Sequence, residues 1–345
     1  MIASSRHGVD PDAPVDPPAP GGAVRFGVLG AARIAPKALI RPIAAIDGAV
    51  VTVVAARDRF RAEAFAAEHG IPTVVDDYAA VVTSDQVDVV YNPLPMSLHA
   101  HWTIAAMEAG KHVLCEKPFA ANAAEAAAMV AAASRTGRVL GEAFHHRYHP
   151  LFPRVLDEVR SGRIGPLRRV EAWFSTPVAR PDLRWDYATA GGSLMDLGCY
   201  PMSWVRHVTG EEPAVVSAAA VEGPPRIDAS METELVFPSG VTARVRSAMD
   251  EPRAAGMRII GRDGGIDVDN PMAPQSGNRL TITTPGGTTT GPVDAGVSYD
   301  HMVRAFLDHL VHGAPFPTSG ADAVANMAAI DAVYEASGLG RRGDP

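Results

Sequence analysis

The chain has 345 residues, of which 47% are hydrophobic and 20% are charged, and it carries a formal net charge of −8. This composition is typical of a globular protein with a sizeable core, and the length allows two domains. The acidic balance argues against general nucleic-acid binding, which needs a basic face. No apolar run reaches the roughly 18 residues of a membrane span. The 2 cysteines make no disulfide framework, which favours a reducing, cytoplasmic setting.

The first residues of the chain are rich in proline, as in Asp16-Pro17-Pro18-Ala19-Pro20, and poor in residues that build a core. We expect residues 1–22 to form a disordered tail. This tail lacks the apolar segment of a secretory signal.

Strands and helices alternate over residues 23–144. Such alternation is typical of α/β proteins, and it predicts a domain with a doubly wound parallel sheet. The apolar runs and turn signals place the strands at 24–30, 50–57, 71–75, 87–92, 112–115 and 139–143, with helices between them.

Residues 145–345 follow a different pattern, in which strands succeed one another with few helices between them. Strands without crossover helices predict an α+β domain with a mostly antiparallel, open sheet. We expect its strands at 167–175, 214–221, 231–237, 241–249, 257–261, 265–268 and 279–284, and its helices at 151–160, 194–209, 299–312 and 321–337.

A turn of small residues joins the first predicted strand to the first helix. Its sequence, Gly30-x-Ala32-x-x-Ala35, stands where a dinucleotide fingerprint opens a Rossmann helix. A glycine permits the tight turn, small residues let a pyrophosphate approach, and the helix N-terminus offers N–H groups. Ala32 replaces the usual second glycine, and the alternative is a merely structural turn. We predict that the cofactor contacts Gly30, Ala31, Ala32, Arg33 and Ile34.

The end of the second strand indicates which cofactor is bound. Arg57 stands near the position that reads the adenosine ribose. NAD enzymes tend to place a carboxylate there, whereas an arginine suits the 2′-phosphate of NADP. Because Arg57 precedes Asp58, NADP is favoured, NAD stays possible, and Arg33 is a candidate second cation. The alternative is that Arg57 is solvated and Asp58 caps the next helix.

The segment Val113–Phe119 places a lysine at the end of a buried strand. Glu116-Lys117-Pro118 stops the strand, because proline gives no N–H to a sheet and keeps the preceding residue extended. We therefore expect Lys117 at the carboxyl edge of the sheet, where ligands bind in open α/β folds. Desolvation there favours the neutral amine; the alternative is a solvated lysine at a strand end.

Four motifs occur together in a fixed order: the Gly30–Ala35 turn, Asn92-Pro93-Leu94-Pro95 with His99, Glu116-Lys117-Pro118, and the segment Gly191–Tyr200. In this combination the chain resembles the glucose–fructose oxidoreductase / inositol dehydrogenase / MocA family over residues 24–337. The resemblance implies a Rossmann domain over 23–144, a substrate domain over 145–345 whose open sheet forms a dimer face, and a substrate held between them. It also matches Lys117 and Asp196 to the lysine and aspartate of the family's motifs.

Many members of the family have a histidine four residues after the motif aspartate, whereas this sequence has Tyr200. This difference resembles the branch of dihydrodiol dehydrogenases and NADP-dependent D-xylose dehydrogenases, and it moves the acid/base role to a tyrosine. A cation near a phenol lowers the pKa of the phenol, and burial lowers that of a lysine, so Lys117 beside Tyr200 would yield one usable base. We predict Tyr200 as acid/base, Lys117 as its partner or the proton relay, and Asp196 as the residue that orients substrate hydroxyls. A core tyrosine and a helix-terminal carboxylate are the alternatives.

The predicted site extends to the loops around these motifs, where the resemblance implies the cofactor contacts and position in the chain suggests the substrate contacts. Asn92, Pro93, His99 and Glu116 are expected to border the cofactor, and His145, Arg147 and Trp185 the substrate. Three histidines within residues 145–149 invite a zinc site, but no cysteine or helical histidine pair completes a tetrahedral set, so we expect no metal.

These observations predict an NADP-dependent oxidoreductase that moves a hydride between nicotinamide and a sugar-like polyol ring, such as D-xylose at C1 or a trans-dihydrodiol. The alternatives are an NADPH-dependent keto-sugar reductase and a non-catalytic NADP-binding regulator. The expected partners are a carbohydrate or polyol substrate and a second copy of the chain in a dimer, with neither nucleic acid nor membrane.

Overall fold

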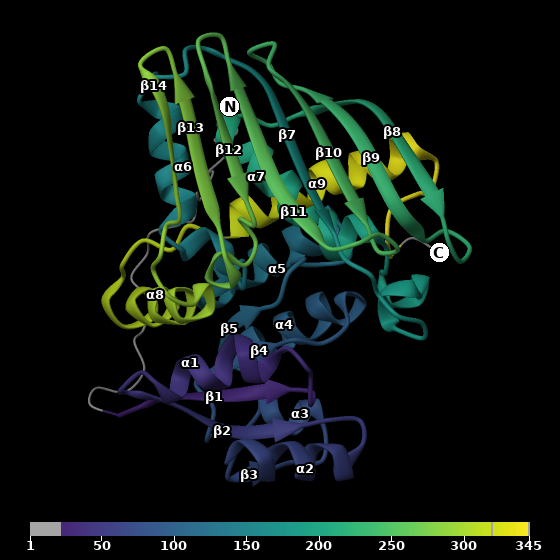
Figure 1. The fold of residues 1–345 in the computed structure, drawn as a ribbon. Helices are drawn as coiled ribbons and strands as arrows, with labels where there is room; N and C mark the ends of the chain where they lie inside the picture. Colours follow the sequence, from purple (N-terminus) through teal and green to yellow (C-terminus); the bar gives the residue numbers. More distant parts are fainter. Residues whose placement is uncertain (1–21, 319, 344–345) are drawn as a thin grey trace, which may run out of the picture.

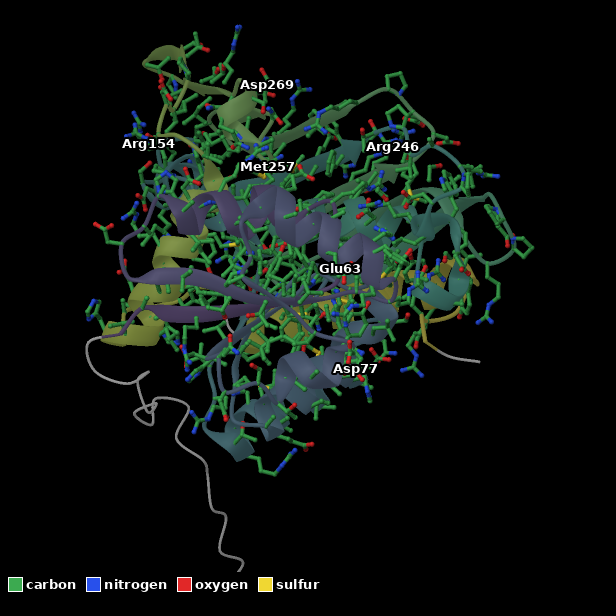
Figure 2. The ribbon with its side chains drawn as sticks, turned by 90° about the horizontal axis from the view of Figure 1, so that it is seen from below. Glu63, Asp77, Arg154, Arg246, Met257 and Asp269 are labelled. Carbon is green, nitrogen blue, oxygen red and sulfur yellow. The ribbon has the colours of Figure 1, made fainter. Side chains whose placement is uncertain are left out.

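The computed structural model describes residues 22–318 and 320–343. The predicted tail, residues 1–22, therefore lies outside the described residues apart from Gly22. Figure 1 shows two sheets, one below the other, with helices packed against both. Figure 2 views the side chains from below, so that the smaller sheet and its helices, with Glu63 in α2 (Arg59–His69) and Asp77 at the start of α3 (Tyr78–Val82) labelled, lie nearest the viewer.

The smaller sheet is parallel throughout and has the strand order β3-β2-β1-β4-β5-β6. This confirms the predicted doubly wound sheet. Its strands are short and apolar, because both faces are covered by helices. Their bounds are β1 (Val24–Leu29), β2 (Ala49–Ala55), β3 (Thr73–Val74), β4 (Val89–Asn92), β5 (His112–Cys115) and β6 (Leu140–Glu142).

Local signals set the ends of the crossover helices. The side chains of Asp58 and Asn122 accept hydrogen bonds from the first turns of the helices that follow them, and Gly70 and Gly137 close these helices in the left-handed conformation. The helices are a π-helical turn (Pro36–Ile40) that leads into α1 (Arg41–Ala44), then α2 (Arg59–His69), α3 (Tyr78–Val82), α4 (His99–Glu108) and α5 (Ala123–Thr136).

The chain reverses its winding direction between β1 and β4, which are neighbours in the sheet. Ligands of open α/β sheets bind at such a switch point, outside the carboxyl ends of the strands. Gly30, the Asn92 loop and Lys117 all follow the carboxyl ends of β1, β4 and β5. The topology thus brings three of the four sequence motifs to one edge.

The larger sheet has eight strands in the order β14-β13-β12-β11-β7-β10-β9-β8. Only the β7–β10 pair is parallel, so the predicted mostly antiparallel sheet is confirmed. The strands are β7 (Leu167–Ser175), β8 (Ala214–Glu222), β9 (Asp228–Val236), β10 (Thr242–Ala248), β11 (Ala254–Gly261), β12 (Gly265–Asp269), β13 (Arg279–Thr284) and β14 (Gly287–Gly291).

Helices α6 (Leu151–Arg160), α7 (Cys199–Thr209) and α9 (Gly320–Ser337) lie on one side of this sheet (Figure 1). The strands alternate accordingly, with apolar side chains toward the helices and charged ones such as Arg244 and Glu232 on the other face, where these two form an ion pair. No helix in the described part of the chain is long and apolar enough to cross a bilayer.

The last two helices connect the sheets. Helix α8 (Ser298–His312) packs against the first sheet, where Phe306 lies 6.5 Å from Phe26 of β1 between ring centroids. Helix α9 packs against both α5 and β8. The sheets are therefore held together by several segments, and the boundary at 144/145 stays a prediction.

Candidate active site

Lys117 reaches from the edge of the parallel sheet into the second half of the molecule. Its Nζ donates to the backbone oxygen of Asp196 at 2.8 Å and to the Asp196 carboxylate at 3.0 Å. Both side chains are nearly buried, with 16% and 11% of their surface exposed. An ion pair thus joins the end of β5 to the turn (Leu194–Gly198) that opens α7.

The second oxygen of Asp196 accepts from Nε of Arg184 at 2.7 Å. Burial raises the pKa of Asp196, but the charges of Lys117 and Arg184 outweigh it and leave the pKa below its ordinary value. Burial likewise lowers the pKa of Lys117, but the Asp196 charge leaves it above the ordinary value. The expectation of a neutral, desolvated Lys117 is therefore wrong: the amine is a paired ammonium.

Tyr200 lies under the same lysine, with Lys117 Nζ 5.2 Å from the centre of its ring. The ammonium faces the ring rather than the hydroxyl, so it does not act as the cation that lowers the phenol's pKa. Burial instead raises the pKa of Tyr200 well above its ordinary value. The predicted juxtaposition of the three residues is found, but Tyr200 is a neutral phenol and not an activated phenolate.

A buried cluster fixes the segment that carries Asp196 and Tyr200. The Asp228 carboxylate accepts from Ser193 Oγ at 2.8 Å, from the Leu194 backbone N–H at 2.7 Å and from Arg342 Nη2 at 2.8 Å. Gly192, with φ +135°, comes so close that an added Cβ would lie 2.2 Å from an Asp228 oxygen. Gly192 thus lets the backbone pack directly on a buried carboxylate, and Gly191 lets it pass close to the backbone carbonyl of Arg184.

The turn after β1 suits a dinucleotide. Gly30 has φ +89°, a conformation that a larger residue rarely adopts, and Ala31 and Ala32 are small and partly exposed. The N–H groups of Ala35 and Lys37 donate to the carbonyls of Ala32 and Ile34, and Pro36 has no N–H, so the helix starts directly after the Gly30–Ile34 turn and directs its positive dipole end toward it. Gly30 to Ile34 would therefore hold the cofactor's phosphates.

The cationic candidates lie close to this turn. Arg57 and Arg61 are both exposed, and Arg61 Nη2 approaches the Ala31 carbonyl at 3.4 Å. Asp58 accepts from the backbone N–H groups of Phe60 and Arg61, as the alternative reading of the sequence expected. Arg33 pairs with Asp182 at 2.8 Å.

Asn92, His99 and Glu116, which were also predicted to border the cofactor, are buried and stabilise the loops in which they lie. The Asn92 amide donates to the His99 carbonyl and to Thr103, and the ring of His99 lies between the carbonyls of Leu94 and Pro118. Glu116 accepts from Tyr91 at 2.7 Å, and burial raises its pKa. Pro93 lies in the loop that these contacts hold.

The three candidate substrate residues each have a protein partner. His145 is buried against Tyr200, Arg147 pairs with Asp322 at 3.1 Å, and Trp185 carries the Arg180 guanidinium 4.2 Å above its ring. A hollow of about 530 Å³ lies beside the Arg180–Asp186 loop.

The histidines near residue 145 point to different neighbours. His145 contacts Tyr200 and Ser298, whereas His149 accepts from the Leu151 N–H. Among the described residues, no three His, Cys, Asp or Glu side chains meet in an arrangement that would hold a metal ion.

Two family models match this chain. Residues 24–144 match the "Oxidoreductase family, NAD-binding Rossmann fold", and residues 152–267 match the "GFO/IDH/MocA C-terminal domain". The chain belongs to this family. The GFO/IDH/MocA resemblance inferred from the four motifs is thus confirmed, as is the prediction of a nicotinamide-dependent oxidoreductase.

Several GFO/IDH/MocA proteins align over nearly their full length. A D-xylose 1-dehydrogenase (NADP(+)) from Haloferax volcanii is 38% identical, over 91% of this chain and 98% of that protein. A dTDP-3,4-didehydro-2,6-dideoxy-alpha-D-glucose 3-reductase from Streptomyces violaceoruber is 35% identical, over 83% and 85%. The structure of KijD10, a 3-ketoreductase from Actinomadura kijaniata in complex with NADP and TDP-benzene, superposes with a TM-score of 0.86 and 28% identity, over 91% and 98%.

Two residues of this site were missed from the sequence. Arg184 stands in a loop segment whose partner, Asp196, becomes visible only in three dimensions. Arg61 carried a weak signal, since it lies in the first turn of α2, four residues after Arg57.

The depressed pKa of Asp196 predicts a pH-dependent contribution to stability. A carboxylate whose folded pKa lies below its unfolded value stabilises the fold above the unfolded pKa and loses this contribution as pH falls through the folded pKa. Urea unfolding from pH 7 down to about pH 3 should therefore reduce the stability of the wild type more than that of Asp196→Asn. The exposed Asp157→Asn variant is the control, and wild-type and Asp196→Asn curves that stay parallel over this range would contradict the assignment.

Proposed function

We propose that this protein transfers a hydride between NADP and a ring carbon of a sugar-like polyol, such as C1 of an aldopyranose or a carbinol carbon of a trans-dihydrodiol. The observation that carries the proposal is the cluster of Lys117, Asp196 and Tyr200. It stands at the carboxyl edge of the parallel sheet, on the same edge as the Gly30 turn.

Each residue of the cluster has a separate role in the proposed reaction. NADP supplies the hydride acceptor when it is bound, and the Gly30–Ile34 turn would hold its phosphates. The Lys117 ammonium gives two of its three N–H bonds to Asp196, so the third is available for a substrate oxygen on which negative charge develops. Tyr200 exchanges the proton of that oxygen at its hydroxyl. Asp196 holds the ammonium in place and keeps it charged.

The residues that follow β2 favour NADP over NAD. Asp58, the residue that might otherwise bind the ribose hydroxyls of NAD, uses its carboxylate to cap α2. Arg57 and Arg61 remain as exposed cations near the turn, and guanidinium groups suit a phosphate. We therefore assign the 2′-phosphate to these two arginines.

Two observations support a polyol ring as the substrate. The similar D-xylose 1-dehydrogenase (NADP(+)) is named for such a ring, and the hollow beside Trp185 and Arg180 lies in the loop whose Arg184 bonds to Asp196. A keto-sugar reductase is the second candidate, because both the dTDP-sugar 3-reductase and KijD10 are named as reductases. The same cluster serves both directions, since a neutral Tyr200 is ready to donate a proton. The dimer and the cytoplasmic location stay predictions.

The function is tested by following nicotinamide absorbance with the purified protein, NADP or NAD, and a panel of aldopyranoses, inositols and trans-dihydrodiols. Wild type should reduce NADP with a pyranose or a dihydrodiol, and Tyr200→Phe should lower turnover by about 10²-fold or more while NADPH still binds. Tyr148→Phe, which removes a hydroxyl bonded to Thr318 away from the cluster, is the matched control.

Two results would speak against the proposal. Turnover of Tyr200→Phe equal to that of Tyr148→Phe would remove the acid/base assignment. No turnover of any panel member by wild type that binds NADPH tightly would favour the reductase, which a matching panel of keto-sugars with NADPH then tests.

The cofactor assignment predicts a selective loss of NADP binding. Arg57→Ala should weaken NADPH binding by about tenfold or more and leave NADH binding nearly unchanged, because only NADPH carries the extra phosphate. Fluorescence titration of both dinucleotides measures this, with the exposed Arg279→Ala as control. Equal weakening of NADPH binding and NADH binding in Arg57→Ala would mean that Arg57 does not contact the 2′-phosphate.

A further inference from the structure

The hydroxyl of Tyr200 has a buried histidine behind it. His145 Nε2 lies 3.3 Å from Tyr200 Oη, and the two side chains are 1% and 4% exposed. This distance is at the long end for a hydrogen bond, as is common for catalytic groups before substrate binds. A neutral phenol that must release a proton during alcohol oxidation needs an acceptor, and His145 is the group in place.

The contacts continue from His145 to the surface. His145 Nδ1 lies 2.8 Å from Ser298 Oγ, and Ser298 Oγ lies 3.2 Å from the amide oxygen of Gln275. Ser298 is fully buried, whereas Gln275 is partly exposed. Three side chains therefore lead from the tyrosine hydroxyl to the edge of the protein.

The donors and acceptors along this chain fit one direction. Since the amide oxygen of Gln275 only accepts, Ser298 donates to it and its own oxygen is left to accept the Nδ1–H of His145. The Nε2 of a neutral His145 then carries a lone pair, which accepts the hydroxyl of Tyr200. With its proton directed at His145, Tyr200 offers its oxygen lone pairs to a substrate hydroxyl.

We propose that His145 and Ser298 form a proton relay behind Tyr200, with His145 as the residue that orients the tyrosine hydroxyl and passes on its proton. This inference rests on the proposed function of Tyr200. It gives His145 a positioning role through the tyrosine in place of the direct substrate contact expected from the sequence.

The proton transfers of the oxidation balance, and His145 is again a neutral imidazole at their end. The substrate O–H bond breaks and its proton binds Tyr200 Oη, while the proton of Tyr200 moves to His145 Nε2. The Nδ1 proton of His145 moves to Ser298 Oγ, and the Ser298 proton, which is directed at the amide oxygen of Gln275, is released to solvent at that partly exposed residue. The electron pair of the substrate C–H bond leaves as hydride to the nicotinamide, so the substrate becomes a carbonyl compound. Reduction runs the same chain backwards.

The surroundings keep His145 in the form that this relay needs. Its ring stacks on Tyr299 with centroids 3.9 Å apart and an angle of 27° between the planes, which fixes where both nitrogens point. Burial, helped by the charges of Lys37 and Lys117, holds the pKa of His145 well below its ordinary value, so the ring stays neutral.

The neighbouring His146 provides a matched control. It is equally buried and its ring lies 5.4 Å from the Tyr200 ring, but neither of its nitrogens has a hydrogen-bond partner among the described residues. His145→Phe and His146→Phe each exchange a buried imidazole for a larger apolar ring. Only the first removes nitrogens that contact the tyrosine and the serine.

Kinetics of the two variants test the relay. His145→Phe should lower kcat by about ten- to a hundredfold, with KM and NADPH binding within about twofold of wild type, whereas His146→Phe should keep kcat within about twofold. Ser298→Ala is a smaller change and should lower kcat by about threefold or more. This variant keeps the relay testable if His145→Phe does not fold. Equal kcat values for His145→Phe and His146→Phe, or a wild-type kcat in Ser298→Ala, would overturn it.

A spectroscopic measurement on the protein without cofactor is independent of turnover. In ¹⁵N-histidine-labelled protein, the signals that disappear in the His145→Phe variant should be those of a neutral imidazole protonated at Nδ1. Signals of an imidazolium, or of the Nε2–H form, would overturn the proposed direction. If Tyr200→Phe retains turnover, the proposed role of Tyr200 fails; if it is inactive while His145→Phe and Ser298→Ala are fully active, only the relay fails.

Discussion

The candidate active site depends on one nearly buried ion pair, between Lys117 at the end of the parallel sheet and Asp196 in the second half of the chain. A charge removed from water is tolerated only when it is paired and hydrogen-bonded, and breaking such a pair by deleting one partner typically costs about 3–5 kcal/mol. The pair therefore joins the Lys117 motif of the parallel sheet to the Asp196 segment, which Asp228 holds from the other side, and it keeps the lysine charged. Tyr200, one turn after Asp196, is brought under the ammonium by the same contact.

Further ion pairs extend this contact to the cofactor turn. Arg184 bonds to both Asp196 and Asp182, and Asp182 in turn bonds to Arg33 beside Gly30. A series of alternating charges thus runs from the turn that suits phosphates to the candidate catalytic cluster. Because Asp182 and Arg184 belong to the loop beside the hollow of about 530 Å³, this loop is held at both ends of the proposed site.

The fold could be predicted to within a few residues because its signals are local. Buried strands ended by glycine or proline, and helices capped by Asp58 and Asn122, need no tertiary context to be recognised. Strand β14 was missed because Gly287–Gly291 is made of threonines flanked by glycines and is exposed, so it has no apolar alternation. It exists because Leu280–Thr284 offers a neighbouring edge.

That the candidate residues lie together was predictable from the sequence, but their electrostatics were not. The sequence motifs identify Lys117, Asp196 and Tyr200, yet the charge of a lysine depends on whether burial or a partner dominates, and only the 3.0 Å contact decides this. The contact between His145 and Tyr200 joins residues that are 55 positions apart, with no periodicity to reveal it.

The measurement that tests this account most directly is a double-mutant cycle on Lys117→Met and Asp196→Asn, read by urea unfolding at neutral pH. The account predicts that the two residues act as a unit, so the double variant should be more stable than the sum of the single effects implies, by about 1–3 kcal/mol. Effects that add within about 0.5 kcal/mol would show that the pair is not the constraint on which the site depends.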